Sequence, residues 1–220
     1  MALLTNQRNS VDVDLFDEIK ELLKRYQPHL KADVSGDRIL VHGIFLCESV
    51  LGIFDAFDIE VIIFPEFPLT EPLVRETGGR IPRVVDRHIS ANGSCCIEVW
   101  EYWLWKCEQP NFENFLLGPL RSFFVSQWHF EKYGDWPFGE RSHYHAGMRE
   151  AYSEMFDVPV DADFLRLVEI LRGGPIKGHH PCPCGSGRRF RDCHRDHLNA
   201  LRDQLLPQVI EQMWSRLSKQ

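Results

Sequence analysis

The stretch "FDAFDIEVIIFPEFPLTEP", residues 54–72, joins two kinds of backbone and decides the fold. In its first half, apolar side chains recur at every second position, namely Phe57, Ile59, Val61 and Ile63. A period of two is typical of a strand with one buried face. Prolines then follow at positions 65, 68, 72 and 82, and proline cannot donate to a sheet ladder. We therefore predict a strand, followed over residues 64–84 by an ordered, extended segment outside the sheet.

Two further strand-like runs precede this stretch. They are "LKADVS" (30–35) and "ILVHGIFLC" (39–47), and short turns separate all three runs. Short connections between consecutive strands favour an antiparallel meander. Before the strands, "DVDLFDEIKELLKRY" (12–26) has apolar side chains at helical spacing, with acidic residues first and basic residues last. This pattern predicts a surface helix packed on the sheet.

Helical patterns follow the proline-rich segment. We expect helices over residues 111–128, 139–156 and 161–174. Pro119 fits the first of these if it lies in the first turn, and Gly173 is placed to end the third. Either Asp161 or Asp163 is placed to cap the third helix. Because the strands are grouped and the helices are segregated, the sequence predicts an α+β fold.

Composition limits the class of protein. The chain has 220 residues, of which 44% are hydrophobic, enough for one domain of about 150 residues and an appendage. The N-terminal "MALLTNQRNS" lacks a basic region followed by an apolar run, so we predict no secretory signal, and no apolar run is long enough to span a membrane. Seven cysteines without an export signal indicate metal binding and free thiols rather than disulfides. We expect a cytoplasmic protein.

Charge is spread unevenly along the chain. The formal net charge is −7, but residues 175–220 carry eight Lys and Arg against four Asp and Glu. The remaining residues are therefore strongly acidic, which argues against nucleic acid as the principal partner. The basic C-terminal part keeps open a third, less favoured hypothesis, a zinc-stabilised nucleic-acid binder.

The stretch "CPCGSGRRFRDCH", residues 182–194, has the spacing of a metal site. It resembles the SEC-C zinc motif, C-x-C-x8-C-[CH], including its Gly-Ser-Gly turn. Zinc prefers four cysteine or histidine ligands in a tetrahedron. We therefore expect a structural Zn²⁺ held by Cys182, Cys184, Cys193 and His194, with no position left for water.

A second resemblance rests on the order of elements and on two motifs. Pro65, Phe67, Pro68 and Pro72 follow the proline-rich crossing of ubiquitin-conjugating enzymes, and "DRHISANGSCCIEVW" (86–100) aligns without a gap to their active-site loop. The chain thus resembles the ubiquitin-conjugating (UBC) fold family over about residues 10–156. The resemblance places Cys96 on the catalytic cysteine. The family's His-Pro-Asn becomes Asp86-Arg87-His88 here, which is similar to the divergent bacterial branch.

The resemblance implies a fold and an activity. The fold is an N-terminal helix, a four-stranded antiparallel meander and C-terminal helices. The activity is that of a transferase, in which Cys96 accepts a protein C-terminus as a thioester and passes it to an amine. Bacterial members of this branch resemble proteins of antiphage operons, including the cyclic-oligonucleotide (CBASS) type. The implied partner is a cGAS/DncV-like nucleotidyltransferase or a ubiquitin-like protein. We expect no membrane partner, and the acidic charge makes nucleic acid the least favoured partner.

The adjacent cysteines leave alternatives open. Cys96 is the expected nucleophile, and Cys95 should point the opposite way and pack inward. Both thiols are inert on the competing interpretation, because free cysteine is commonly buried. His88 stands where the family's asparagine stabilises an oxyanion or braces the loop, and an imidazole is capable of either role.

Domain boundaries and a rival function complete the predictions. We expect a conjugating-like domain over 10–174 and, after a Gly-Gly-Pro linker, a SEC-C module over 175–220. An apolar helical stripe over residues 195–219 requires a cover from its own chain, a second copy or a partner. The rival hypothesis is a non-catalytic adaptor that docks partners through the SEC-C module.

Overall fold

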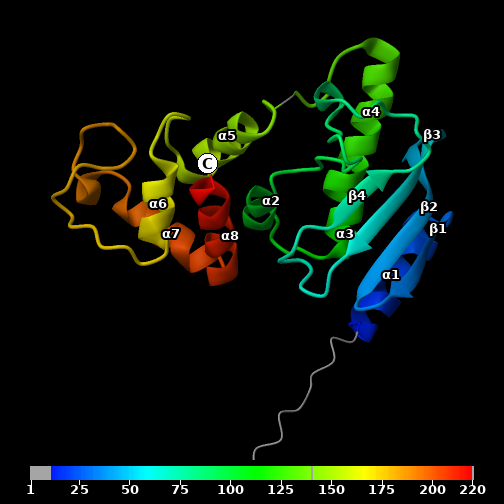
Figure 1. Ribbon diagram of the computed structural model, residues 1–220, viewed down its shortest axis with the longest axis horizontal. Helices are drawn as coiled ribbons and strands as arrows, with labels where there is room; N and C mark the ends of the chain where they lie inside the picture. Colours follow the sequence, from blue (N-terminus) through cyan, green and yellow to red (C-terminus); the bar gives the residue numbers. More distant parts are fainter. Residues whose placement is uncertain (1–10, 140, 220) are drawn as a thin grey trace, which may run out of the picture. The chain divides into compact units, whose positions relative to one another are not determined.

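The computed structural model describes residues 11–139 and 141–219, and residue 10, where the first domain was expected to begin, lies outside them (Figure 1). The elements in order are α1 Val13–Tyr26, β1 Leu30–Ser35, β2 Arg38–Ser49, β3 Gly52–Ile63, β4 Leu73–Glu76, η1 Val85–Arg87, α2 Trp100–Lys106, α3 Phe112–Phe115, η2 Leu116–Leu120, α4 Arg121–Tyr133, α5 His145–Phe156, α6 Phe164–Leu171, η3 Phe190–Asp192, α7 Arg195–Gln204 and α8 Pro207–Ser218.

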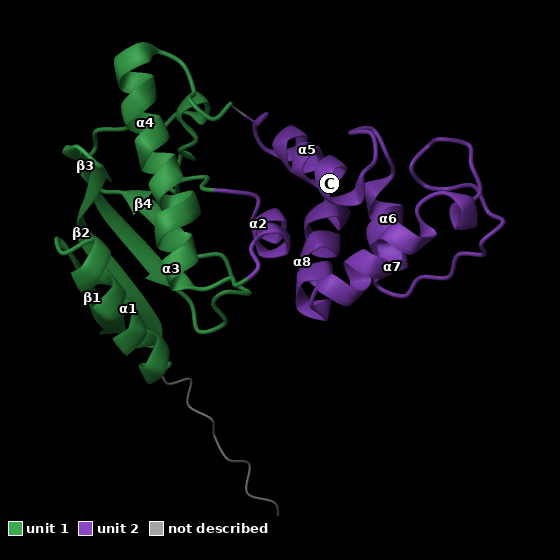
Figure 2. Cartoon of the chain, turned by 180° about the vertical axis from the view of Figure 1, so that it is seen from behind, with its two compact units in different colours: residues 1–97, 109–139 green, residues 98–108, 140–220 purple. Residues whose placement is uncertain are grey.

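The chain divides into two compact units (Figure 2). The first, here called the sheet unit, comprises Met1–Ile97 and Gln109–Gly139. The second, here called the helical unit, comprises Glu98–Glu108 and Glu140–Gln220. These units do not follow the expected boundary at residue 174, because α5 and α6 group with the C-terminal helices rather than with the sheet.

The sheet unit contains one four-stranded antiparallel sheet in the order β1-β2-β3-β4. This meander and the segregated helices confirm the α+β prediction. The β2–β3 turn needs only two residues, Val50 and Leu51, since Ser49 pairs with Gly52. The predicted N-terminal helix is also present as α1, capped by Asp12, whose side chain accepts from the backbone N–H of Leu15.

The fourth strand corrects one prediction. Residues 64–84 were expected to lie outside the sheet, but β4, Leu73–Glu76, pairs with β3. Pro72 precedes the strand and the next proline is Pro82, so every residue of β4 has a backbone N–H to donate. The density of prolines around this short strand hides it in the sequence.

The core of the sheet unit lies between the sheet and α4. Phe124 of α4 is fully buried, and its ring centroid lies 5.3 Å from that of Phe45 on β2 and 5.1 Å from that of Phe57 on β3. The predicted helix over 111–128 is interrupted before α4. Gly118 departs from helical geometry (φ −97°, ψ −105°), and Pro119 follows it inside η2 rather than in the first turn of one continuous helix.

The helical unit covers the apolar stripe of the C-terminal segment. Pro207 divides the expected stripe into α7 and α8 and lies at the start of α8, where its missing N–H costs little. Both helices contact α6, and α8 also contacts α2. The side chains buried on α7 and α8 are Leu198, Leu201, Val209, Ile210, Met213 and Leu217. The apolar stripe is therefore covered by other helices of the same chain, the first of the three alternatives.

Candidate functional site

The paired cysteines lie on a short hairpin over residues 88–96, here called the cysteine hairpin. Its turn is built by the Asn-Gly pair: Gly93 adopts φ 85°, and the Asn92 side chain accepts from the backbone N–H of Ser94 at 3.0 Å. The backbone N–H of Ser90 donates to the carbonyl of Ser94 at 2.9 Å. A left-handed glycine after asparagine is a common solution for a tight hairpin turn.

Backbone hydrogen bonds attach this hairpin to the sheet. Ile89 and Cys95 form an antiparallel bridge, and the N–H of Cys96 donates to the carbonyl of His88 at 2.8 Å. On the other side, the N–H of Cys95 donates to the carbonyl of Val74 in β4 at 2.8 Å. The cysteines are therefore positioned by the edge of the sheet.

The two thiols have opposite environments. Successive side chains of an extended strand point to opposite faces. Cys95 is 7% exposed, and burial raises the pKa of its thiol to about 12, whereas Cys96 is exposed. The prediction that Cys95 packs inward is confirmed. Since the thiolate is the reactive form, Cys95 is inert near neutral pH.

His88 braces the hairpin through its backbone. It is a non-glycine residue in the left-handed region, with φ 52° and ψ 32°, and its carbonyl accepts from Cys96. Its imidazole meets the ring of Trp136 edge-on, with 5.3 Å between centroids. The backbone of His88 thus supports the hairpin, while the bracing and catalytic roles predicted for its imidazole stay predictions.

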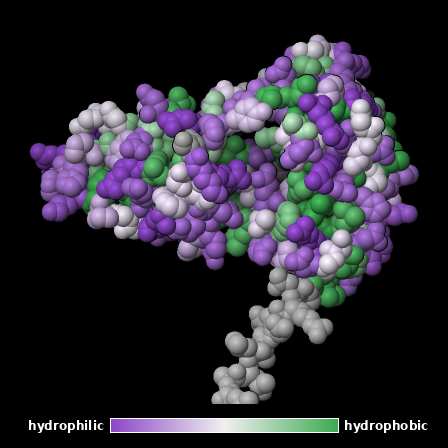
Figure 3. All heavy atoms as spheres, in the orientation of Figure 1, coloured by the Kyte–Doolittle hydropathy of each residue, from purple (hydrophilic) through white to green (hydrophobic). Residues whose placement is uncertain are grey.

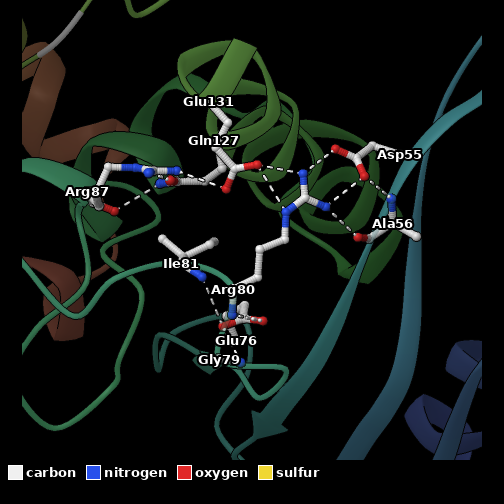
Figure 4. A network of polar contacts seen from close by, with 9 residues as sticks. All are labelled: Asp55, Ala56, Glu76, Gly79, Arg80, Ile81, Arg87, Gln127 and Glu131. Carbon is white, nitrogen blue, oxygen red and sulfur yellow. Dashed lines mark hydrogen bonds and ion pairs between the residues drawn. The ribbon is translucent and has the colours of Figure 1, made fainter. Parts of the chain in front are cut away.

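A polar network behind the hairpin was not predicted from the sequence (Figure 4). Arg87, the residue before His88, exchanges two hydrogen bonds of 2.9 Å with the buried side chain of Gln127 on α4. Glu131, one turn further along α4, lies 3.3 Å from the Arg87 guanidinium. The sequence did contain a signal for the burial of Gln127. Gln127 follows Phe123 by four residues, so the two side chains lie on the same face of a helix.

Arg80 extends the network to β3. Its guanidinium donates to both carboxylate oxygens of Asp55, at 2.7 and 2.6 Å, and to Glu131 at 3.0 Å. The hydrogen bond to Asp55 is the largest cause that raises the pKa of Arg80 above its ordinary value. Burial opposes ionisation of Asp55, yet the bond from Arg80 keeps the pKa of that carboxyl below its usual range. Arg80 therefore ties α4 to the sheet.

The second candidate site is in the helical unit. The side chains of Cys182, Cys184, Cys193 and His194, here called the cysteine–histidine cluster, bring one ligand atom each within 4.8 Å of one another. The Cys184 and Cys193 sulfurs are 3.6 Å apart, and Nδ1 of His194 is 3.4 Å from the Cys182 sulfur. Zinc–sulfur bonds of about 2.3 Å in a tetrahedron put ligand atoms about 3.7 Å apart. The donor set and its spacing are compatible with zinc.

Contacts outside the cluster orient its histidine. Nε2 of His194 lies 2.9 Å from the carbonyl of Asp157, which follows α5. Donation from Nε2 leaves Nδ1 as the ligand atom, the usual arrangement around metal-bound histidine. Nε2 of His197 lies 3.0 Å from the carbonyl of Met155, and the N–H of Asp163 donates to the carbonyl of Pro183. The cluster is thereby fastened to α5 and to the start of α6.

The cluster thiols differ in acidity. Burial opposes ionisation of Cys184, but hydrogen bonds from Ser186 and its neighbours outweigh burial and lower the pKa of Cys184 to about 6. Burial raises the pKa of Cys182 to about 12. Because a bound metal requires thiolates, binding must displace the proton of Cys182, and affinity should rise with pH.

Exposed cations lie close to the cluster in the sequence. Lys177, Arg188, Arg189 and Arg191 are all exposed, and the end of the helical unit that carries them is mainly hydrophilic on the face in Figure 3. The basic residues that make the C-terminal part of the sequence positively charged are therefore exposed at the surface of this segment.

Comparison with known proteins identifies one feature of the chain. The SEC-C motif matches residues 181–196, which contain all four residues of the cysteine–histidine cluster. No curated protein and no solved structure matches the chain. Among the described residues, no helix has the length and hydropathy that crossing a membrane requires. The chain thus carries a SEC-C motif whose four cysteine and histidine side chains are compatible with zinc binding.

Proposed function

We propose that this protein is a ubiquitin-conjugating-like acyl carrier. Cys96 accepts the C-terminal acyl group of a protein as a thioester and passes it to an amine. The observation that carries the proposal is the cysteine hairpin, which exposes Cys96 and buries Cys95 at the edge of the sheet. Inert buried thiols, the competing interpretation, would not leave one member of the pair at the surface.

The order of elements supports the same proposal. In the chain, α1, strands β1–β3, the proline-rich segment, β4, the cysteine hairpin and the later helices follow one another, which agrees with the N-terminal helix, four-stranded meander and C-terminal helices that the resemblance to the UBC fold implies. In this chain the cysteine hairpin is attached along β4 through the hydrogen bond from the N–H of Cys95 to the carbonyl of Val74. It is an argument from arrangement, and it assigns Cys96 the role of the thioester residue.

The chemistry proceeds in two acyl transfers. The Cys96 thiolate attacks an activated C-terminal carbonyl, the carbon–sulfur bond forms, and the bond to the leaving group breaks. An amine then attacks the thioester, the carbon–nitrogen bond forms, the Cys96 thiolate leaves, and the amine loses a proton to solvent. In each step His88 is the candidate donor to the developing oxyanion.

The cysteine–histidine cluster fits a structural zinc ion. Cys182, Cys184, Cys193 and His194 would complete its coordination, so the ion would supply folding energy rather than a reacting water. We assign no step of the acyl transfer to it.

The partners follow from the resemblance alone. We favour a cGAS/DncV-like nucleotidyltransferase as the acyl donor in a bacterial antiviral operon, with a ubiquitin-like protein as the other candidate. Intact mass of the protein co-expressed with its operon neighbours, before and after thiol treatment, distinguishes the two by the mass of the adduct.

A second candidate function is an adaptor without catalysis. The exposed cations Lys177, Arg188, Arg189 and Arg191 favour it, since they suit an acidic partner surface. If the protein is an adaptor, partner binding should be unchanged by Cys96→Ala and should weaken as the salt concentration rises. No covalent adduct should form.

The test of the main proposal is substitution of each cysteine. With the partner present, wild type should form an adduct that hydroxylamine removes, and Cys96→Ser should form an oxyester that is more stable to hydroxylamine. Cys95→Ser is the matched control and should keep the adduct. Adducts on Cys96→Ala would show that the assignment of Cys96 is wrong.

A further inference from the structure

The pairing of Arg87 with Gln127 joins distant parts of the sheet unit. Gln127 is 0% exposed, and both of its side-chain hydrogen bonds go to Arg87. Its Nε2 donates to the Arg87 carbonyl, and its Oε1 accepts from the Arg87 Nε, each at 2.9 Å. A buried amide that recognises one residue by both backbone and side chain fixes that residue more firmly than either bond alone.

The backbone carries this constraint to Cys96. The Arg87 carbonyl and the His88 N–H belong to one planar peptide. Gln127 holds the carbonyl end, and the His88 N–H donates to the carbonyl of Val85 at 2.7 Å. The next peptide presents the His88 carbonyl to the N–H of Cys96. Two consecutive peptides are therefore anchored, and the second holds the backbone of Cys96.

The conformation of His88 requires such anchoring. Its left-handed φ of 52° costs about 1 kcal/mol for a residue with a Cβ atom. Such a conformation persists only when its surroundings over-determine it. Without the bond from Gln127, the peptide before His88 loses one of its two anchors.

Two aromatic rings reinforce the arrangement. The Arg87 guanidinium lies 4.9 Å from the ring centroid of Phe130, which stacks on Trp136 at 4.5 Å. Trp136 in turn meets the His88 imidazole. Both side chains of the Arg87-His88 pair thus contact the same pair of stacked rings. Figure 4 shows Arg87 beside Gln127 of α4.

We infer that Gln127 is a positioning residue for Cys96, acting through the carbonyl of Arg87 and the backbone of His88. The inference rests on the proposed function for its meaning, because it concerns how the thioester cysteine is held for acyl transfer. Gln127 touches no reacting atom in this arrangement, and its effect reaches Cys96 through Arg87 and the backbone of His88.

The chain contains a matched control for this inference. Gln27 is 4% exposed, and its side chain also makes two hydrogen bonds to one residue, with the N–H and the carbonyl of Leu46. Gln27→Met and Gln127→Met therefore remove the same kind of interaction, one on β2 and one behind the cysteine hairpin. Both should lower the stability of the sheet unit by similar amounts.

The experiment measures the rate at which iodoacetamide modifies Cys96 as a function of pH, read by peptide mass spectrometry on folded full-length protein. We expect Gln127→Met to change this rate about three- to tenfold or to shift its pH midpoint, and Gln27→Met to leave both unchanged. The inference would be overturned if the two variants gave the same dependence of the alkylation rate on pH, or if Gln127→Met gave the same dependence as wild type.

A second variant and a second readout keep the test decisive. If Gln127→Met fails to fold, Gln127→Glu replaces it, because the carboxylate still accepts from Arg87 but no longer donates to its carbonyl. The alkylation assay needs no partner, so failure of wild type to form a thioester would overturn the proposed function without touching this inference. Normal thioester formation and transfer by Gln127→Met would overturn the inference and leave the function standing.

Discussion

At the residue scale, the paired cysteines show how one backbone turn gives two neighbours different chemistry. The Ile89–Cys95 bridge makes the chain extended there, so Cys95 points into the core and Cys96 toward solvent. The alternation follows from strand geometry and needs no special environment. Burial alone then separates an inert thiol from an accessible one.

Burial of Cys95 predicts a stability loss at alkaline pH. An unfolded thiol ionises near pH 8.5, but the pKa of folded Cys95 is about 12. Between these values the unfolded state binds fewer protons, so the free energy of unfolding falls as pH rises. Urea unfolding between pH 8 and about pH 10 should show a fall about 2 kcal/mol larger in wild type than in Cys95→Ala. Parallel pH dependences in the two proteins would contradict the burial of this thiol.

At the element scale, helix ends were predicted where the signal is local. Asp12 and Asp163 cap α1 and α6 through bonds to residues three positions on, and Gly173 follows α6 with a φ of 94°. The four strands implied by the resemblance are present, but the residue pattern did not locate β4, because a strand of four residues is defined by its pairing with β3. Gln127 was missed for the same reason: its partner Arg87 lies 40 positions away in the sequence. The SEC-C ligands were found because three of them share a window of twelve residues.

The contact between α2 and α8 contains an ion pair with one buried partner. Arg216 Nε lies 2.9 Å from Glu101 Oε1, with the Glu101 side chain 1% exposed and that of Arg216 44% exposed. Burial raises the pKa of Glu101, which the charge of Arg216 opposes. Within the described residues, the other Glu101 oxygen and the hydroxyl of Tyr152 have no hydrogen-bond partner. The buried charge of Glu101 is therefore compensated by Arg216.

Arg216→Met should destabilise the helical unit by about 1–3 kcal/mol, a value reduced for the exposure of Arg216. The loss should shrink as pH falls from 8 toward 5, because Glu101 then takes up a proton and the buried charge disappears. Chemical denaturation followed by helix signal measures it. Adding Glu101→Gln to Arg216→Met should recover most of the lost stability, and a double variant no better than the single one would show that the charge is not the cause.

At the scale of the whole molecule, the division into units changes what the SEC-C segment does. The sequence suggests an appendage joined by the Gly-Gly-Pro linker at 173–175. In the structure, α6 before the linker packs with α7 and α8 after it. His194 of the cluster lies within hydrogen-bond distance of the Asp157 carbonyl, and the nearby His197 does the same with the Met155 carbonyl. The C-terminal segment is thus part of the core of the helical unit, which also includes α2, the first helix after Cys96 in the sequence.

Removing the proposed zinc ion should therefore loosen more of the helical unit than the SEC-C motif itself. We expect Cys184→Ser, or treatment with a chelator, to speed hydrogen exchange in α5, α6 and α7, because His194 and His197 no longer hold the end of α5. Strands β2 and β3 should keep their protection. Cys107→Ser is the matched control, since Cys107 lies outside the cluster, and added Zn²⁺ should reverse the effect of the chelator. Faster exchange confined to residues 176–194 would mean that the cluster stabilises only its own loop, and that the appendage view drawn from the sequence was right.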